Sequence, residues 1–475
     1  MRTGFGPVRA AAAAARLAAD GPRAVLVAGV AAGVAPGVRA GDLIVADEVR
    51  GPDGAVPIPT AAPLSAALRQ AGLRVHVGPI ASSPVLVDAR QAGRAGGDQH
   101  GDGVLAVDME SAWLAGAASG GPFAVVRAVV DTPTAPLLRP GTPVRALAAL
   151  RSLHRAAPVL RSWLAATGPR VVTLAEPRSF CAGVERAIQT VERALDRHGA
   201  PVYVRRQIVH NAHVVRRLEG RGAVFVEEVA EVPEGAVLVL AAHGVTPGVR
   251  EQAAAAGLAV VDATCPLVTK VHAEVRRHAG QRRTVFLIGH GEHEEVVGTV
   301  GEAPDDVVVV GSVDAARRVR ARDPEQTAYA MQTTLATDEA DEIAAVLRGR
   351  FPTIAAPRRD DICYATTNRQ RAVRAVAESA DLVIVVGSAN SSNSLRLAEV
   401  AERSGAAAQL VDDASGLDLT RLARARRIGI SAGASAPDDL VDDVVTCLSG
   451  LGPVAVTTVA TGVEDIRFTL PKEVS

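Results

Sequence analysis

The stretch LVIVVGSANSSNSLRLAEVA, residues 382–401, decides the fold of this chain. Five apolar residues predict a buried strand, and a polar turn separates them from a helical pattern. The same order recurs in VLVLAAHGVTPGVREQAAAA (237–256), TVFLIGHGEHEEVVG (284–298) and RIGISAGASAPDDLVDDVV (427–445). We expect the runs that begin at 237, 382 and 427 to be buried parallel strands, each followed by a helix with polar N-terminal residues. Strands that alternate with helices in this way predict an α/β protein.

The turns that follow these strands carry many polar side chains. They are His243, His290, His293, Ser388, Ser391, Ser392, Asn393, Ser431 and Ser435. Ligands of open α/β sheets bind beyond the carboxyl ends of the strands, and helix N-termini there favour anions. A single serine at the start of a helix is usually only an N-cap. Because similar turns recur at equivalent strand ends, we instead predict one anion-accepting pocket shared by similar α/β units.

Three of the four cysteines lie in polar segments that are far apart in the sequence. These are Cys181 in SFCAGVERA, Cys265 in VDATCPLVTKVH and Cys363 in DDICYATTNRQ. Cys181 lies near the start of a predicted helix, where a thiol favours its thiolate form, and Pro266 opens a helix directly after Cys265. Three thiolates without a nearby fourth favour an iron–sulfur cluster that keeps one iron open for chemistry. Zinc is the alternative, although no Cys-x-x-Cys pair is present.

Composition limits the class of protein. A length of 475 residues predicts two to four domains, and 48% hydrophobic with only 3% aromatic residues predicts cores of Val, Ala and Leu. Lys+Arg total 51 against 52 Asp+Glu, which argues against a nucleic-acid partner. The chain lacks an apolar run of the ~18–20 residues that span a bilayer, so we expect no membrane insertion. Four cysteines do not form a disulfide framework, and a reducing cytoplasm is the expected location. Cys447 lies on an apolar helical stripe and is predicted to be a core residue.

A Gly-Pro break within ATGPR, residues 166–170, divides the chain. We predict one domain over residues 1–166 and another over residues 170–475. All four cysteines fall in the second of these.

Residues from about 170 to 475 resemble the 4-hydroxy-3-methylbut-2-enyl diphosphate reductase family. The matching segments include FCAGVERAI, YVRRQIVHN, AAHGV, DATCPLVTKVH, QTTL, DDICYATTNRQ, GSANSSNSLRLAE and AGASAP. The resemblance implies three similar α/β units around a central [4Fe–4S] cluster held by Cys181, Cys265 and Cys363. It also implies the last step of the methylerythritol phosphate route to isoprenoids. There, electrons from reduced ferredoxin or flavodoxin remove the hydroxyl of an allylic diphosphate as water, giving isopentenyl and dimethylallyl diphosphate.

The resemblance also assigns roles to individual side chains. The diphosphate pocket would be lined by His210, His243, His293, Ser391, Ser392, Asn393 and Ser435. Glu295 would deliver the proton to the leaving hydroxyl, working with Thr333 or Thr334. Members of the family typically read His-Pro-Glu at the acid, whereas this chain reads His293-Glu294-Glu295, so Glu294 remains an alternative acid. His290 and His213 are expected to be packing residues.

Residues 1–166 resemble a shortened nucleoside phosphorylase or nucleosidase of the purine type. The resemblance lies in TGFGP from Thr3, in VAGVAAGVAPGVRAGDLIVADEV, in VDMES from Val107 and in VRAVVDTP up to Pro133. It implies that Glu110 holds the ribose hydroxyls and that Asp131 protonates the leaving base. This region would then cleave an adenosyl-type nucleoside, or would be an inactive domain kept for assembly or regulation. A third reading makes the whole chain a cluster-based sensor without turnover.

Overall fold

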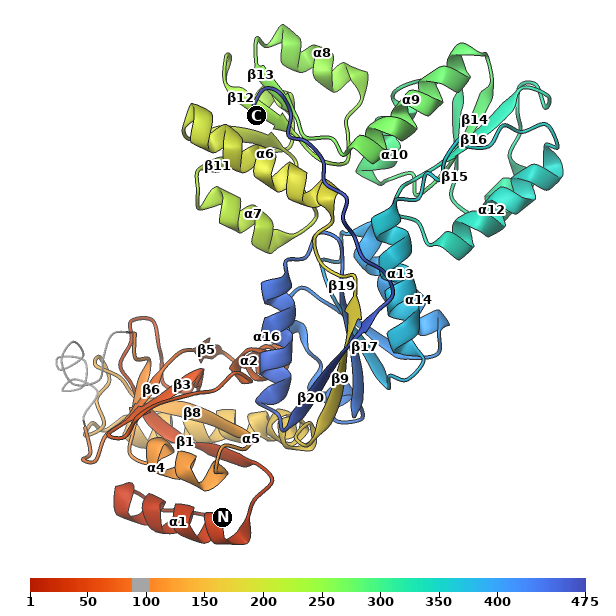
Figure 1. Ribbon diagram of the computed structural model, residues 1–475. Coiled ribbons are helices and arrows are strands. Elements are labelled where there is room, and N and C mark those ends of the chain that lie inside the picture. Colours follow the sequence, from red (N-terminus) through yellow and green to blue (C-terminus); the bar gives the residue numbers. More distant parts are fainter. Residues whose placement is uncertain (88–102) are drawn as a thin grey trace. The chain divides into compact units, whose positions relative to one another are not determined.

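The computed structural model describes residues 1–87 and 103–475 (Figure 1). They form two compact units. The first comprises Met1–Val172, Asp413–Ile428 and Asp442–Thr457, and the second Thr173–Asp412, Gly429–Val441 and Thr458–Ser475. Among the described residues, no helix is long and apolar enough to cross a membrane.

The first unit is built on an eight-stranded mixed sheet of order β4-β3-β6-β7-β1-β8-β2-β5. The strands are β1 (Val25–Gly33), β2 (Leu43–Val45), β3 (Glu48–Gly51), β4 (Gly54–Pro57), β5 (Val75–Val77), β6 (Ile80–Ser82), β7 (Ala106–Asp108) and β8 (Phe123–Asp131). All nine residues of β8 are buried, as expected for a central strand. The helices are α1 (Pro7–Asp20), α2 (Ala61–Gln70), α4 (Ser111–Ala115), α5 (Thr142–Ala165) and α15 (Leu419–Leu422).

The second unit contains three separate sheets, each with its own helices. In the first, four parallel strands have the order β11-β10-β12-β13. These strands are β10 (Val202–Arg205), β11 (Ala223–Val226), β12 (Val237–Leu240) and β13 (Ala259–Asp262). The associated helices are α6 (Ala182–His198), α7 (Ala212–Glu219) and α8 (Pro247–Ala255). Leu470 and Val474, from the last residues of the chain, join the apolar core of this sheet.

The second sheet has three parallel strands in the order β15-β14-β16. Its strands are β14 (Thr284–Ile288), β15 (Val307–Val310) and β16 (Thr327–Met331). Its helices are α9 (Pro266–Gly280), α10 (Glu294–Val300), α11 (Val313–Arg318) and α12 (Thr337–Arg350). Every residue of β14 and of β16 is buried, which explains their continuous apolar sequences.

The third sheet has the order β18-β17-β19-β9-β20. The strands are β9 (Arg170–Glu176), β17 (Leu382–Val386), β18 (Ala407–Val411), β19 (Arg427–Ala432) and β20 (Val454–Ala460). Helices α13 (Tyr364–Ala377), α14 (Ser392–Arg403) and α16 (Asp438–Ser449) accompany it. Cys447 is buried on α16, as its apolar stripe predicts.

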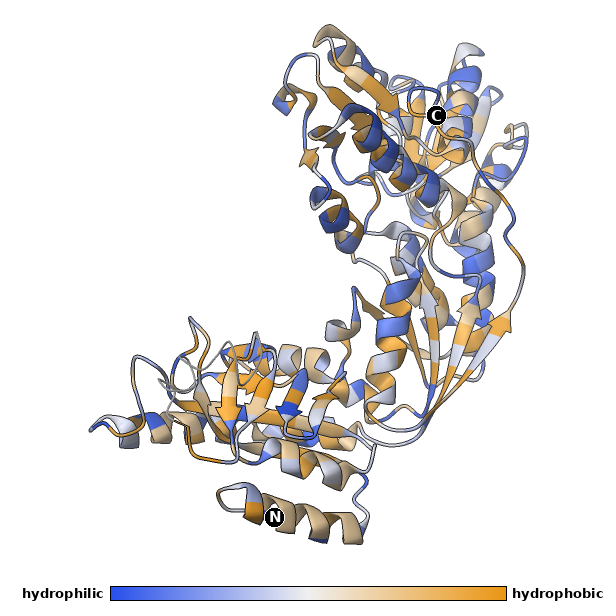
Figure 2. Ribbon diagram, turned by 60° about the vertical axis from the view of Figure 1, so that its left-hand side comes forward, coloured by the Kyte–Doolittle hydropathy of each residue, from blue (hydrophilic) through white to orange (hydrophobic). Residues whose placement is uncertain are grey.

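The α/β fold class and the three similar units predicted from the sequence are confirmed by these sheets. Each of the four apolar runs forms a strand, namely β12, β14, β17 and β19. Figure 2 shows the strands mainly in the colours of apolar residues, whereas the helices carry both apolar and polar residues. The run that forms β14 is also a buried parallel strand, although the sequence predicted buried parallel strands only for the other three runs.

Candidate active site

Each of the three predicted cysteines occupies the position just before a helix. Cys181 is the N-cap of α6, Cys265 of α9 and Cys363 of α13, so one helix from each α/β unit begins at a cysteine. The N-terminus of a helix carries partial positive charge, which favours a thiolate. The three sulfur-bearing residues therefore share one local environment, although they come from remote parts of the sequence.

The three cysteines line a single cavity of about 100 Å³. Gly183, in the first turn of α6, marks how closely two of them approach. A Cβ atom at this glycine would lie 2.7 Å from Cys265 Sγ and 3.8 Å from Cys181 Sγ, so only glycine leaves room for both sulfurs. All three thiols are free of disulfides.

The electrostatics of these thiols fit a positively charged ligand. Burial, together with the neighbouring Cys181 and Cys363 thiols, raises the pKa of Cys265 to about 12. Burial and the nearby Cys181 raise the pKa of Cys363 to about 11. Buried thiols that lie this close together resist ionisation unless a cation compensates their charge. Among the described residues that line the cavity these are the only cysteines, and three converging thiols fit a metal centre with one open position.

A buried arginine holds two of the cysteine segments together. Arg369, on α13, is fully buried and donates hydrogen bonds to the backbone carbonyls of Arg178, Ser179 and Phe180, directly before Cys181. Its guanidinium also pairs with Glu464 at 2.9 Å. Arg369 belongs to the DDICYATTNRQ segment that contains Cys363, but no role was predicted for it.

A second cationic side chain anchors the segment before Cys363. Lys270, on α9, pairs with Asp361 at 2.9 Å and donates to the carbonyls of Arg359 and Asp360. The other carboxylate oxygen of Asp361 accepts the N–H of Met331 at the end of β16. The helix that begins after Cys265 thus fixes the loop that leads to Cys363.

The structure brings all of the predicted site residues of the second unit to the same cavity. Its polar lining contains His210, His243, His293, Glu295, Thr333, Thr334, Ser391, Ser392, Asn393 and Ser435. Phe468, which sequence reasoning missed, also lines it. His290, Ser388 and Ser431 follow the predicted strands but are not among the residues lining this cavity. His213 lies beside Arg216 on α7 instead.

The three histidines of the cavity form one cluster. The rings of His210 and His243 stack with centroids 4.1 Å apart, and His293 meets them edge-on at 5.7 and 5.8 Å. Burial lowers the pKa of all three rings, to about 4 for His293. Close packing of like groups lowers the pKa of His243 further. The cluster is therefore neutral at neutral pH in the absence of a ligand.

Serine, threonine and asparagine side chains complete the polar wall. Ser391 caps α14 by accepting the N–H of Ser394, so the N-cap function of this serine holds. Ser392 accepts a hydrogen bond from Thr334 at 3.1 Å. Both polar atoms of the buried Asn393 side chain lack a hydrogen-bond partner among residues 1–87 and 103–475. A buried amide with no partner is costly and is expected to bind a ligand.

Glu295 is a buried carboxyl group held in a fixed position. Its two oxygens accept the backbone N–H of Thr333 at 2.7 Å and the hydroxyl of Thr333 at 2.9 Å. Burial raises the pKa of Glu295 to about 7, against the opposing effect of these hydrogen bonds. The carbonyl of Thr333 accepts the N–H of Cys363, so the carboxyl group is tied to a cysteine segment. Such a group exchanges protons near neutral pH.

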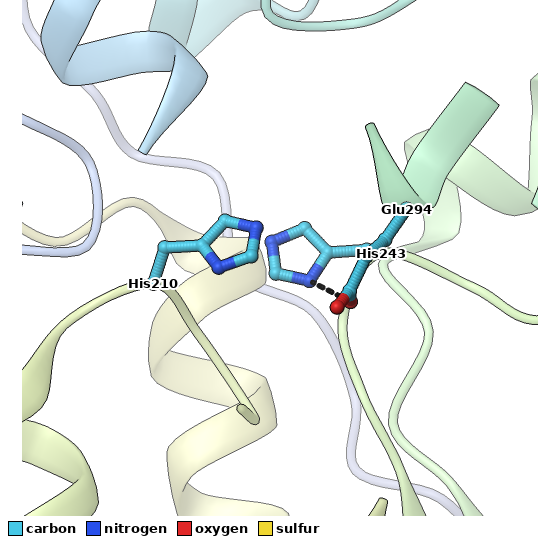
Figure 3. Close-up of side chains that lie close together, drawn as sticks. All are labelled: His210, His243 and Glu294. Atoms are coloured by element: carbon cyan, nitrogen blue, oxygen red, sulfur yellow. Dashed lines mark ion pairs between the residues drawn. The ribbon is translucent and has the colours of Figure 1, made fainter. Parts of the chain in front are cut away.

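Glu294, the alternative acid, does not line the cavity. Its carboxylate pairs with Arg206 at 3.3 Å and approaches Nδ1 of His243 at 3.7 Å. It forms with His210 and His243 a group whose ligand atoms lie within 4.8 Å of one another (Figure 3). Nitrogen lone pairs lie in the ring plane, and the planes of these two rings are stacked with an angle of only 21°. Their lone pairs therefore do not converge on a common metal position.

Of the two predicted residues of the first unit, Glu110 belongs to a network of buried charged groups. Glu110 accepts the N–H of Gly6 at 3.0 Å and pairs with Arg127 at 3.2 Å. Arg127 pairs in addition with Asp108 at 2.5 Å, and all three charged groups are buried. Asp131 is buried at the end of β8. The glycine segment, the VDMES segment and β8 thus meet at one buried charge network.

Fold and site together define a class of α/β protein in which three sheets, each with its own helices, surround one cavity lined by three cysteines. The chain belongs to the LytB protein family, whose model matches residues 172–449. Residues 1–151 match the Phosphorylase superfamily. Both resemblances predicted from the sequence are confirmed by these matches.

Named relatives cover the second region almost completely. The 4-hydroxy-3-methylbut-2-enyl diphosphate reductase of Nocardia farcinica is 56% identical over 303 residues, which are 64% of this chain and 90% of the relative. The protein of the same name from Phenylobacterium zucineum is 52% identical over 305 residues, 64% of this chain and 97% of the relative. The solved structure of the E-1-hydroxy-2-methyl-but-2-enyl-4-diphosphate reductase from Plasmodium falciparum is 36% identical. It has a TM-score of 0.62 and covers 65% of this chain and 97% of that one.

Proposed function

We propose that residues 170–475 catalyse the reductive dehydroxylation of 4-hydroxy-3-methylbut-2-enyl diphosphate to isopentenyl diphosphate and dimethylallyl diphosphate. Similarity to the named reductases over most of their length supports this activity. The observation that carries the proposal is a single cavity in which three helix-capping cysteines face a buried carboxyl group and a wall of histidines and hydroxyls. The reaction consumes two electrons and two protons, and the hydroxyl oxygen leaves as water.

The proposed cofactor is an iron–sulfur cluster of the [4Fe–4S] type. LytB relatives are iron–sulfur enzymes. Cys181, Cys265 and Cys363 would hold three of the four irons, and the buried, closely spaced thiols are the donor set that such a group requires. When bound, the cluster supplies electrons and an open iron to the allylic hydroxyl. Reduced ferredoxin or flavodoxin is the proposed electron donor, and a reducing cytoplasm the proposed location.

Protein side chains would bind the diphosphate and supply the proton. His210, His243 and His293, with the hydroxyl and amide groups of the α14 N-terminus and Ser435, donate to diphosphate oxygens. Glu295 gives its proton to the leaving hydroxyl oxygen, and Thr333 keeps the carboxyl group aimed at it. The diphosphate raises the pKa of this carboxyl by its like charge, which keeps the acid protonated at neutral pH. A sensor without turnover would need neither the acid nor the anion-binding wall.

Anaerobic turnover by the full-length chain tests the proposal. We expect the purified protein to be brown, to contain about four irons per chain, and to consume the allylic diphosphate with an artificial reductant. Product analysis should detect both isomeric diphosphates. Colourless protein that holds zinc in place of iron, or iron-loaded protein without turnover, contradicts the proposed reaction.

The second candidate function belongs to residues 1–166, which we propose as a nucleoside-cleaving domain. The contacts among Gly6, Glu110 and Arg127 favour it, because they join three segments that resemble the purine-type enzymes. Glu110 would accept hydrogen bonds from the ribose hydroxyls, and Asp131 would protonate the leaving base. The proposed domain boundary remains within residues 166–170.

Release of a free base tests this second function. Full-length protein incubated with adenosine-type nucleosides, with and without phosphate, is expected to release adenine. The Asp131→Asn variant should lose this release by at least about 100-fold, since it removes a proton donor. Iron content and reductase turnover serve as internal controls. No free base from the wild-type chain under either condition retires the nucleoside-cleaving proposal.

A further inference from the structure

Glu294 is a carboxylate beside the proposed diphosphate site that the mechanism above does not use. It is the first residue of α10, and its carboxylate approaches His243 (Figure 3). The same carboxylate pairs with Arg206 at 3.3 Å. Arg206 has a backbone φ of 55°, in the left-handed region that non-glycine residues seldom adopt. Such conformations persist where surrounding contacts hold them, often next to a functional site. Arg206 also lies 3.8 Å from the exposed Glu227 and Glu228, but its shortest ion pair is the one with Glu294 at 3.3 Å.

The position of Glu294 determines which nitrogen of His243 carries a proton. Nδ1 of His243 is buried, has no hydrogen-bond partner within the described protein, and faces the Glu294 carboxylate at 3.7 Å. A carboxylate only accepts hydrogen bonds and attracts a proton, so we infer that it favours the tautomer with the N–H on this nitrogen. In the neutral ring the other nitrogen, Nε2, then has a lone pair and cannot donate to an anion. Figure 3 shows this second nitrogen on the side of the ring nearer His210.

The proton of the neutral His293 ring lies on the other nitrogen. Its Nδ1 accepts the backbone N–H of Glu295 at 3.2 Å, so the proton of the neutral ring lies on Nε2. His293 can donate to an anion without becoming charged. The two histidines of one cavity are thus fixed as different tautomers by their neighbours, and only His243 needs an extra proton to become a donor.

We propose that Glu294 is a positioning residue whose carboxylate lets His243 take up a proton when a diphosphate binds. The doubly protonated ring then donates from Nδ1 to Glu294 and from Nε2 to a diphosphate oxygen. Arg206 neutralises part of the Glu294 charge and so limits its repulsion of the ligand. This inference rests on the proposed diphosphate site and extends it to the proton balance of binding.

The charges around His243 give the sign of the pH dependence. His210 and His293 face the ring from neighbouring loops, and Glu294, backed by Arg206, faces it from α10. Gly244, the residue after His243, packs against the ring of His272 from α9. Nδ1 of His272 lies 2.8 Å from the Glu302 carboxylate. Burial and the other two rings keep the pKa of His243 well below its usual value without ligand. Burial lowers the pKa of the stacked His210 ring, whereas the Glu294 carboxylate raises it and lies 3.7 Å from His243. We expect bound diphosphate to raise the pKa of His243, so that binding takes up a proton and weakens as the pH rises.

Calorimetry of inorganic diphosphate binding to the full-length, anaerobically purified protein tests this. Titrations in two buffers of different protonation enthalpy, at about pH 8, give the number of protons taken up. Wild-type protein is expected to take up about one proton more than Glu294→Gln. The same ligand is used throughout, so its own protonation cancels in the difference. Glu294→Gln should bind about tenfold more weakly at this pH, with a smaller deficit at about pH 6.

Two further variants and a kinetic readout separate positioning from simple structural damage. Glu292→Gln changes an exposed carboxylate two residues earlier and should behave as wild type. Glu294→Asp keeps the charge and should restore part of the proton uptake. In turnover assays Glu294→Gln should raise KM and leave kcat within about threefold.

The proposal and the proposed reaction fail in different ways. Unchanged proton uptake with equal or tighter binding in Glu294→Gln overturns the role of Glu294. Wild-type protein that takes up the extra proton but does not reduce the allylic diphosphate supports that role and refutes the reaction. Wild-type protein that does not bind diphosphate overturns both.

Discussion

Anaerobically purified Cys265→Ser protein is expected to be nearly colourless and to lose measurable turnover. The serine hydroxyl does not ionise at neutral pH and is a poor ligand for iron, so one of three protein ligands is lost. The loss should exceed the roughly 10- to 100-fold that removal of an outer partner of a metal ligand costs. Visible absorption, iron per chain and substrate consumption measure the effect.

The fourth cysteine provides the matched control. Cys447 is more deeply buried than Cys265, and it lies in the apolar core on α16, away from the cavity lining. Cys447→Ser should retain colour, iron and turnover. If Cys265→Ser keeps its iron and its activity, or if both serine variants lose them alike, the three-cysteine site is wrong.

The Glu295→Gln variant should keep its colour and lose about 10²- to 10⁴-fold in turnover, which is the usual contribution of a positioned proton donor. The pH dependence has a definite sign. Burial raises the pKa of Glu295 to about 7, and only the protonated carboxyl donates. Wild-type turnover should therefore be highest below the pKa of Glu295 and fall as the pH rises through it. Bound diphosphate raises this pKa and so moves the fall to higher pH. The residual turnover of Glu295→Gln should not show this decrease with rising pH.

The neighbouring carboxylate is the control for the choice of acid. Glu294 points to Arg206 and His243 rather than into the cavity, so Glu294→Gln should keep the same decrease in kcat with rising pH. Loss of turnover in Glu294→Gln, with Glu295→Gln remaining active, would reverse the assignment. Rates measured at saturating substrate separate this result from an effect on binding.

The sequence predicted those features that depend on local pattern. Continuous apolar runs identify β12, β17 and β19 because strands buried on both faces need no polar side chains. The helical pattern that follows Cys181 and the proline that follows Cys265 predicted helix starts at these two cysteines. The start at Cys363 was not predicted, because the residues after it (YATTNRQ) show no clear apolar period.

Features that depend on remote partners could not be predicted in this way. Arg369 looks like an exposed helical residue, and its partners are backbone carbonyls before Cys181, which leave no mark in the sequence. Glu294 and Glu295 have the same chemistry, so the sequence does not distinguish them. Their side chains face different surroundings because α10 begins at Glu294. Phe468 reaches the cavity from a segment without regular structure, whose course no residue pattern reveals.

The pairing of Arg369 with Glu464 has a consequence for biogenesis. Cys181 leaves the ribosome long before Glu464 has been translated, and until then the arginine that secures its loop lacks its carboxylate partner. Iron delivered to a nascent chain would therefore meet an unfinished scaffold. We therefore expect the proposed metal site to be completed only after the polypeptide has been synthesised beyond this glutamate, and a chain stalled before it to accept iron poorly.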